Sequence, residues 1–348
     1  MSYTSRVFRK TMRGAGVPAA LSVSALSVAA LCMAATASAE TTLKVSSCVT
    51  KTDDQVKTYL QLFHEPVNKA KNGVTLNYIG GPEITPRTKQ GGALKRGLMD
   101  MIHCPSSYYA GMVPEARLLL LSNRGPDELR KDGAYKYLQK AWAKGLNARF
   151  VSWPHWGGSA FHIYLKEKAE LSTKTGIRLN GKRIRSTAAY TPFLKVMGAV
   201  PVDMGAGDLY TALQRGVVAG FAWPEGGIAQ RGWQDHVKYR YEPSFWRSST
   251  AVVMNLDKWN SLSRKDKDVI EAAGIEYERT SGALLRKLAD IDNEKVMKAG
   301  VEPVVLKGQY AEAYLATINN AVWDFVGKAI GDKLSTPFPT LKAALYKE

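Results

Sequence analysis

The chain has 348 residues, of which 45% are hydrophobic and 23% charged, with 30 Gly, 15 Pro and 3 Cys. It is too apolar for a disordered protein and too poor in cysteine for a disulfide scaffold, and its length suits two globular domains. The net charge of +17 suggests nucleic acid or an anionic membrane as partners. The basic residues are, however, interspersed with acids, as in residues 265–268, which is typical of solvated helix faces. We therefore expect no nucleic acid partner.

Residues 1–39 have the pattern of an export signal. Four basic residues precede an uncharged apolar stretch from about 17 to 33, and the small residues Ala37-Ser38-Ala39 follow it. A membrane anchor is the alternative, but Pro18 and many Ser and Ala residues weaken the apolar stretch. We expect cleavage after Ala39 and a periplasmic mature chain. Removing the four cations lowers the net charge from +17 to +13.

Strand and helix patterns alternate through the first part of the mature chain. A strand at 43–46 is followed by Thr52-Asp53, which can cap a helix whose apolar positions extend to about residue 70. Alternating residues at 74–78 predict a second strand, and a helix near 90–96 precedes a third strand at 99–104. Repeated strand–helix–strand units favour a mainly parallel sheet flanked by helices.

Two cysteines of the mature chain follow predicted strands. Cys48 comes after the first strand, and Cys104 closes the third. If these strands are neighbours in the sheet, the two thiols can form a disulfide in an oxidising compartment. Otherwise they are small buried side chains.

A second series of strands and helices begins after a crossing at Gly157-Gly158, which two strand-like runs at 150–156 and 161–165 surround. From Gly181 onward the pattern predicts strands at 182–186, 200–204 and 220–223, with helices at 191–197 and 208–215. A second crossing falls at 251–254. We expect a first lobe of residues 40–160 and 251–290, and a second lobe of residues 161–250 and 291–348 that includes the C-terminal helices. Two such α/β lobes frame a ligand cleft at the carboxyl ends of their strands.

Residues 263–298 form a long helical pattern. Ile270, Tyr277, Leu284 and Ile291 recur every seven residues, which a coiled coil would also show. Gly274 and the shortness of the repeat argue against a free coiled coil, so we expect a helix that lies across both lobes.

Motifs that carry catalysis or cofactors are absent from the sequence. There is no Gly-x-Ser-x-Gly elbow, P-loop, complete Gly-x-Gly-x-x-Gly or Cys-x-x-Cys, and no histidine pair has metal-ligand spacing. We therefore predict no catalytic residue, metal or cofactor.

Tryptophans near predicted strand ends are the first candidates for a ligand site. Trp153 and Trp156 precede the glycine pair, and Trp223 closes a strand. An indole supplies a flat apolar wall with one N–H donor, which suits a hydrophobic or aromatic ligand, although such residues also serve as packing between lobes.

Several segments, in order along nearly the whole mature chain, resemble the extracytoplasmic solute receptors of TRAP (tripartite ATP-independent periplasmic) transporters, the DctP-type family. The most specific are Gly181-Lys182-Arg183-Ile184-Arg185, Gly198-Ala199-Val200-Pro201-Val202 and the run from Asp208-Leu209-Tyr210 to Val218-Ala219-Gly220. The resemblance implies the two-lobed periplasmic binding protein fold, each lobe a mixed or parallel sheet flanked by helices, with a long helix spanning both lobes. It also implies hinge closure, a membrane permease as partner and an arginine, here Arg185, that pairs with the ligand carboxylate. A guanidinium offers a planar pair of donors that matches a carboxylate.

The chain departs from the family pattern after Gly220. Where relatives present a polar contact this chain presents Trp223, and the second arginine common near the first crossing has no match in residues 157–162. These departures favour a monocarboxylate with an apolar or aromatic body over a sugar acid or a dicarboxylate. Four positions complete the candidate site: Lys51, Ser106 and Tyr108 follow strand ends, and Glu83 follows a Gly-rich turn, although such positions also serve as turns and caps.

The sequence thus predicts a monomeric periplasmic receptor, not an enzyme, that captures an organic acid for a TRAP permease. The alternatives are a periplasmic enzyme acting on an organic acid, or a binding protein that serves an ABC transporter or a sensor.

Overall fold

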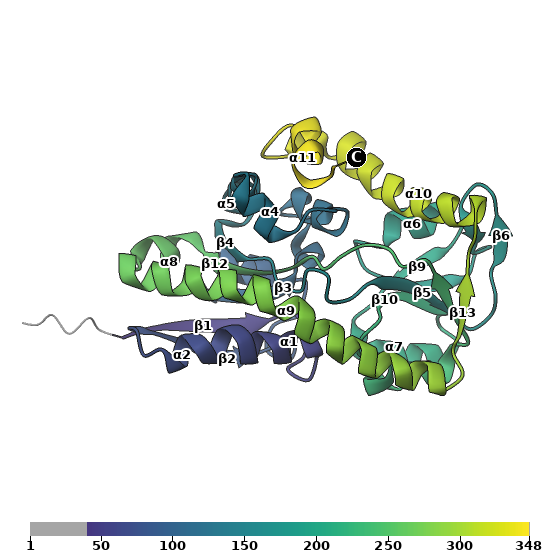
Figure 1. The fold of residues 1–348 in the computed structure, drawn as a ribbon, viewed down its shortest axis with the longest axis horizontal. Helices are drawn as coiled ribbons and strands as arrows, with labels where there is room; N and C mark the ends of the chain where they lie inside the picture. Colours follow the sequence, from purple (N-terminus) through teal and green to yellow (C-terminus); the bar gives the residue numbers. More distant parts are fainter. Residues whose placement is uncertain (1–39, 348) are drawn as a thin grey trace, which may run out of the picture. The chain divides into compact units, whose positions relative to one another are not determined.

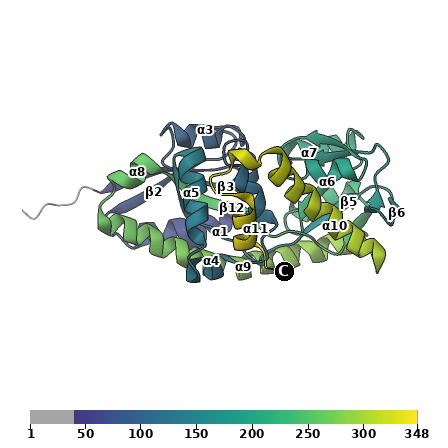
Figure 2. The ribbon, with the colours of Figure 1, turned by 90° about the horizontal axis from the view of Figure 1, so that it is seen from above.

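The computed structural model describes residues 40–347, so the predicted export signal and its cleavage site lie outside the described residues. Across residues 40–347, no helix combines the length and the apolar character needed to cross a membrane. This part of the chain is one compact unit, in which two mixed β-sheets are flanked by helices and accompanied by the long helix α9 (Figures 1 and 2). The predicted fold class is confirmed.

The sheet of the first lobe has the strand order β2-β1-β3-β12-β4. β1 (Thr41–Ser47) pairs in parallel with β2 (Val74–Gly80) and β3 (Met101–Pro105). β12 (Thr250–Asn255) comes from much later in the chain and runs antiparallel to both β3 and β4 (Ala148–Ser152). Every residue of β12 is buried, because this strand lies inside the sheet and helices cover it.

Helices cover the first sheet on both faces. The first begins where Asp53 predicts it, because the Asp53 Oδ1 accepts a hydrogen bond from Gln55 N at 2.9 Å. The buried side chains of Tyr59 and Phe63 pack this helical run beneath α9. The helices of this lobe are α1 (Asp54–Tyr59), the π-helix η1 (Leu60–His64), α2 (Glu65–Lys69), α3 (Gln90–Lys95), α4 (Pro126–Lys131), α5 (Tyr135–Leu146) and α8 (Leu256–Ser261), with the 3-10 helices η2 (Ser106–Tyr109) and η3 (Pro114–Leu120).

The sheet of the second lobe has the order β13-β11-β5-β10-β8-β9. At its centre β5 (Phe161–Leu165) runs antiparallel to β10 (Gly220–Pro224), which pairs in parallel with β8 (Arg183–Ser186). The flanking elements are β9 (Val200–Asp203), β11 (Tyr239–Glu242), β13 (Glu302–Val305), the hairpin β6 (Glu170–Ser172) and β7 (Gly176–Arg178), the helices α6 (Thr191–Val196) and α7 (Ala206–Gln214), and the 3-10 helices η4 (Ala229–Arg231) and η5 (Trp233–His236).

The helix α9 (Arg264–Lys298) contacts elements of both lobes, as predicted (Figure 1). Ser263 caps it by accepting a hydrogen bond from Asp266 N at 3.1 Å. Gly274 lets α9 approach β4 closely, since a Cβ there would lie 3.0 Å from the Val151 carbonyl oxygen. Near its other end, Asp292 accepts hydrogen bonds from the backbone of η4.

The C-terminal segment packs on both lobes. α10 (Gln309–Asp324) contacts α6 and β7, whereas α11 (Phe338–Leu345) contacts η3. The Ser122 hydroxyl donates to the Leu345 carbonyl oxygen at 2.6 Å, which ties the C-terminal helix to the first lobe. Between α10 and α11 lie the π-helix η6 (Phe325–Ala329) and the 3-10 helix η7 (Gly331–Lys333). The division into lobes at 160/161, 250/251 and 290/291 stays a prediction.

Cys48 and Cys104 form a disulfide, with their Cα atoms 4.8 Å apart. The pairing follows from the sheet, because β1 and β3 are direct neighbours and Cys48 is the first residue after β1. Of the two arrangements left open by the sequence, the structure adopts the disulfide.

Candidate functional site

A cavity opens between the two sheets, at the carboxyl ends of strands β3, β8 and β10. It contains about 840 Å³ of space free of protein atoms, part of which is continuous with solvent. The part of the chain predicted as the first lobe contributes Val49, Asp53, Asp54, Gln55, Pro105, Ser107, Tyr108 and Leu120. The part predicted as the second lobe contributes Phe161, Arg185, Thr187, Ala189, Tyr190, Trp223, Pro224, Gly226, Gly227, Arg231, Ser248, Ser249 and Thr250, of which Thr250 begins β12 of the first sheet. Ser159 and Leu285 complete the lining.

Arg185 is the buried cation of this cavity. It lies on β8, with none of its surface exposed, and its Nε and Nη1 donate to the carbonyl oxygens of Met204 at 3.2 Å and Ala222 at 3.4 Å. Its buried Nη2 has no hydrogen-bond partner, and no carboxylate among residues 40–347 pairs with the guanidinium. A buried charge without a counter-ion is costly. The guanidinium therefore offers an anion both a charge and free donors.

Trp223 contacts the Arg185 guanidinium at the end of β10. The Arg185 Cζ lies 4.9 Å from the centre of the Trp223 ring, and the edge of this ring meets Trp233 at a centroid distance of 5.0 Å. The indole N–H donates to the Gly226 carbonyl oxygen at 3.1 Å. Since that hydrogen bond already occupies the N–H, Trp223 can offer the cavity apolar ring surface.

Further aromatic side chains line the cavity from both lobes. Tyr190 stacks on Trp246 with a centroid distance of 5.7 Å, and burial raises the pKa of Tyr190, a rise that the nearby Arg185 charge partly opposes. Phe161 packs against the same pair, and Tyr108 also belongs to the lining. The walls therefore combine four aromatic side chains with several hydroxyl side chains, and the charge is concentrated at a few positions.

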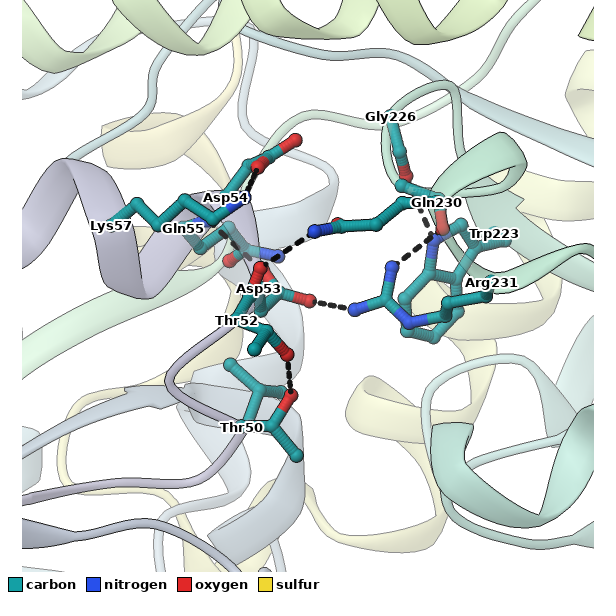
Figure 3. Close-up of polar contacts among 12 residues, drawn as sticks. Thr50, Thr52, Asp53, Asp54, Gln55, Lys57, Trp223, Gly226, Gln230 and Arg231 are labelled. Atoms are coloured by element: carbon teal, nitrogen blue, oxygen red, sulfur yellow. Dashed lines mark hydrogen bonds and ion pairs between the residues drawn. The ribbon is translucent and has the colours of Figure 1, made fainter.

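An ion pair between two lining residues, Asp53 and Arg231, joins the lobes (Figure 3). The Arg231 Nη2 donates to Asp53 Oδ2 at 2.5 Å, and its Nη1 donates to the Gly227 carbonyl oxygen at 2.6 Å. Beside it, Gln230 Nε2 donates to the Thr52 carbonyl oxygen at 3.0 Å. The sequence identified Asp53 as a helix cap only and did not single out Arg231. The glycine pair just after Trp223 was the available signal for a tight turn at a strand end.

The helix α9 fixes the segment that carries Arg231. Asp292 accepts backbone N–H bonds from Ile228 at 2.8 Å and from Ala229 and Gln230, both at 3.1 Å. Burial alone would raise the pKa of the Glu225 carboxyl, but hydrogen bonds from His162 and Arg286 outweigh it and lower the pKa to about 2. The turn between Trp223 and Arg231 is thus held by charged contacts on both sides.

Of the eight ligand-binding residues predicted from the sequence, Arg185, Trp223 and Tyr108 line the cavity. Lys51 lies on an exposed turn before α1. The Glu83 carboxylate accepts the Gly81 N–H at 2.6 Å, and the buried Ser106 hydroxyl donates to the Ala116 carbonyl oxygen at 3.2 Å. None of these three residues belongs to the cavity lining.

Trp153 and Trp156 also lie outside the cavity lining. The Trp153 side chain is fully buried, its Nε1 donates to the Ser248 carbonyl oxygen at 2.7 Å, and the Trp156 ring meets its edge at 5.1 Å. Trp156 lines a different hollow, beside Trp246. β4 ends at Ser152, one residue earlier than Trp153, and the chain then turns toward α9 instead of the cavity. Trp153 is joined to the lining through its bond to Ser248.

Two sheets joined by crossing strands, a helix common to both and a cavity that holds a guanidinium without a counter-ion define a two-lobed ligand-binding protein. The profile of the bacterial extracellular solute-binding proteins, family 7, matches residues 46–328. The chain belongs to this family, and the resemblance to TRAP solute receptors is confirmed.

Known proteins similar to the chain share the fold at low sequence identity. The chain is 22% identical over 226 residues to a monocarboxylate 2-oxoacid-binding periplasmic protein of Nostoc sp.; the match covers 59% of this chain and spans 60% of that relative's length. A Bordetella pertussis extracytoplasmic solute receptor binding pyroglutamic acid superimposes with a TM-score of 0.74 at 18% identity, covering 88% of this chain and 99% of that one. A TRAP periplasmic solute-binding protein from Desulfovibrio salexigens with bound orotic acid gives a TM-score of 0.73 at 18% identity, covering 87% and 99%.

Proposed function

We propose that this protein is the periplasmic receptor of a TRAP transporter, that it captures a monocarboxylate with an apolar or aromatic body, and that it delivers this ligand to the membrane permease. The observation that carries the proposal is the Arg185 guanidinium, which is buried in the cavity with Nη2 unpaired. A ligand carboxylate supplies the missing counter-ion and acceptor.

The remaining lining supports the nature of the ligand body. Phe161, Tyr190 and Trp223 line the cavity together with Arg185, and no lysine or histidine of residues 40–347 does so. Pyroglutamic acid and orotic acid, named for two similar structures, each carry a single carboxylate on a ring, and the Nostoc relative is named for monocarboxylates. The single carboxylate that these ligands share matches the unpaired Arg185 guanidinium.

The direct test replaces Arg185 and measures binding by calorimetry. The probes are pyroglutamate, benzoate, phenylacetate and 2-oxopentanoate. Arg185→Met should weaken binding of the probe that the wild type prefers by about 2–3 kcal/mol, because the carboxylate loses a charge-assisted pair in a desolvated site. Arg185→Lys keeps the positive charge but loses the two parallel N–H donors of the planar guanidinium, so it should retain part of the affinity.

Arg183→Met is the matched control, because Arg183 lies on the same strand but is exposed and outside the lining. An affinity that Arg185→Met leaves unchanged, in a variant that melts like the wild type, would refute the proposed role. Mass spectrometry of ligand released from denatured protein should find a monocarboxylate. Conversion of a probe by purified protein would support the enzyme alternative.

A further inference from the structure

We propose that Asp53 is a positioning residue for specificity: by occupying Arg231, it restricts the cavity to ligands with one carboxylate. This inference rests on the proposed function, in which Arg185 binds the ligand carboxylate. It concerns a pair that joins the lobes, between Asp53 before α1 and Arg231 at the end of η4 (Figure 3).

Two guanidiniums, not one, line the cavity and contact the same indole. The Arg231 Cζ lies 5.6 Å from the centre of the Trp223 ring, and the Arg185 Cζ lies 4.9 Å from it. The two Cζ atoms are therefore no farther apart than these two distances together. Without a competing group, such a pair of cations would suit a ligand with a carboxylate at each end.

One of these two cations is already paired with a carboxylate of the lining. Asp53 pairs with Arg231, and Asp54 pairs with Lys57 at 2.8 Å. Among the charged lining residues that the structure describes, Arg185 is the one without a counter-ion. The charge left for a ligand is that of a single guanidinium, which matches one carboxylate.

Asp53 is held so that a ligand cannot easily displace it. Its Oδ1 is fixed by the hydrogen bond from Gln55 N at 2.9 Å, which leaves Oδ2 directed at Arg231, and the residue is only 5% exposed. The neighbouring bond from Gln230 to the Thr52 carbonyl oxygen holds the same two segments together. A second ligand carboxylate near Arg231 would meet the negative charge of Asp53 and be repelled.

The test is Asp53→Asn, because asparagine is an equally good helix cap, while its side chain carries no charge to hold Arg231. The probes are two matched pairs, 2-oxopentanoate with 2-oxoglutarate and benzoate with isophthalate, in which the second member adds one carboxylate. Calorimetry on the purified full-length mature protein gives the ratio of the two dissociation constants for each pair. In Asp53→Asn the ratio should shift toward the dicarboxylate by at least about tenfold for one pair, since a hydrogen bond to a charged group is worth about that factor.

Three variants distinguish the pairing of Asp53 with Arg231 from the loss of a carboxylate elsewhere and from a weaker contact between the lobes. Adding Arg231→Met to Asp53→Asn should return the ratio to its wild-type value, because the freed guanidinium is gone. Asp203→Asn removes a carboxylate that pairs with Arg87 outside the cavity lining, and it should leave the ratio within about threefold. Gln230→Ala loosens the lobe contact without a charge change and should weaken both members of a pair equally.

Each outcome supports or overturns a defined statement. A wild type that binds none of the monocarboxylates refutes the proposed function and this inference with it. A wild type that binds them through Arg185, with no change of ratio in Asp53→Asn, overturns only the inference, and so does an equal shift in Asp203→Asn. If Asp53→Asn does not fold, Asp53→Ser also keeps a capping oxygen and removes the charge. The ratio of the dissociation constants for monocarboxylate and dicarboxylate, measured in this variant, then tests the inference.

Discussion

The Glu278 carboxylate on α9 is the most connected buried charge of the first lobe, and its removal should destabilise the protein strongly. Its side chain has no exposed surface. It accepts hydrogen bonds from Arg130 Nε at 2.7 Å and Nη2 at 3.0 Å, from the Tyr135 hydroxyl at 2.7 Å and from Trp153 N at 2.6 Å. One carboxylate thereby joins α9 to α4, α5 and the end of β4.

Glu278→Ala should lower the free energy of unfolding by about 3–5 kcal/mol. The Tyr135 hydroxyl loses its acceptor in a buried position, and so does the backbone N–H of Trp153, at about 1–3 kcal/mol for each unsatisfied group. Arg130 loses its counter-ion but keeps a contact with the Tyr135 ring and 27% of its side chain exposed, which limits the penalty. Glu278→Gln keeps a carbonyl oxygen as acceptor and should lose less.

Guanidinium unfolding followed by tryptophan fluorescence measures this difference. Glu276→Ala is the control on the same helix, because Glu276 pairs with Arg279 on the exposed face and should cost no more than about 1 kcal/mol. If Glu278→Ala unfolds at the same denaturant concentration as Glu276→Ala, the reasoning from buried, shared hydrogen bonds is wrong.

Two further predictions concern pH and the disulfide. Burial lowers the pKa of His155 to about 3, against about 6.5 in an unfolded chain, so stability should be full above pH 6.5 and fall as the pH drops toward 3. His155→Asn, which tolerates the local φ of 68°, should flatten this slope in denaturant titrations at pH 7 and 4.5, and an unchanged slope would contradict the assignment. The disulfide joins cysteines 56 positions apart, so replacing Cys48 and Cys104 by Ala should cost about 4 kcal/mol in the chain-entropy estimate. Reduction of the wild type should give the same loss, and a melting temperature insensitive to reductant would exclude a stabilising disulfide.

The fold was predictable because the sheets are built from strongly patterned strands and the sequence carries the family motifs. Strands such as β1 and β2 alternate apolar and polar residues, and Asp53 marks the start of α1. The seven-residue repeat predicted the buried face of α9 only in part. Ile270 and Tyr277 are buried, but Ile291 is 47% exposed. A straight helix drifts from a seven-residue repeat, so its buried face changes along its length.

The site was predictable where one strand directs a side chain into the cavity, as β8 does for Arg185 and β10 for Trp223. It was not predictable for Trp153, because the register at the end of β4 and the contact with Glu278 decide its direction. The pair of Asp53 and Arg231 was equally hidden, since 178 positions separate two residues that only the approach of the lobes brings together. Distant pairing of this kind leaves no local periodic signal.

The two carboxylates of α9 have a mechanical consequence. Glu278 fixes the helix to the first lobe and Asp292 fixes it to η4 in the second, and these anchors lie about 21 Å apart along the axis at 1.5 Å per residue. A movement of one lobe against the other that preserves both anchors must bend the intervening stretch of helix. That stretch passes the crossing between the lobes at Gly282, whose missing side chain leaves room for the Trp156 carbonyl oxygen. Bending of α9 between Glu278 and Asp292 would therefore oppose such a movement, and the helix would act as an elastic element between the lobes.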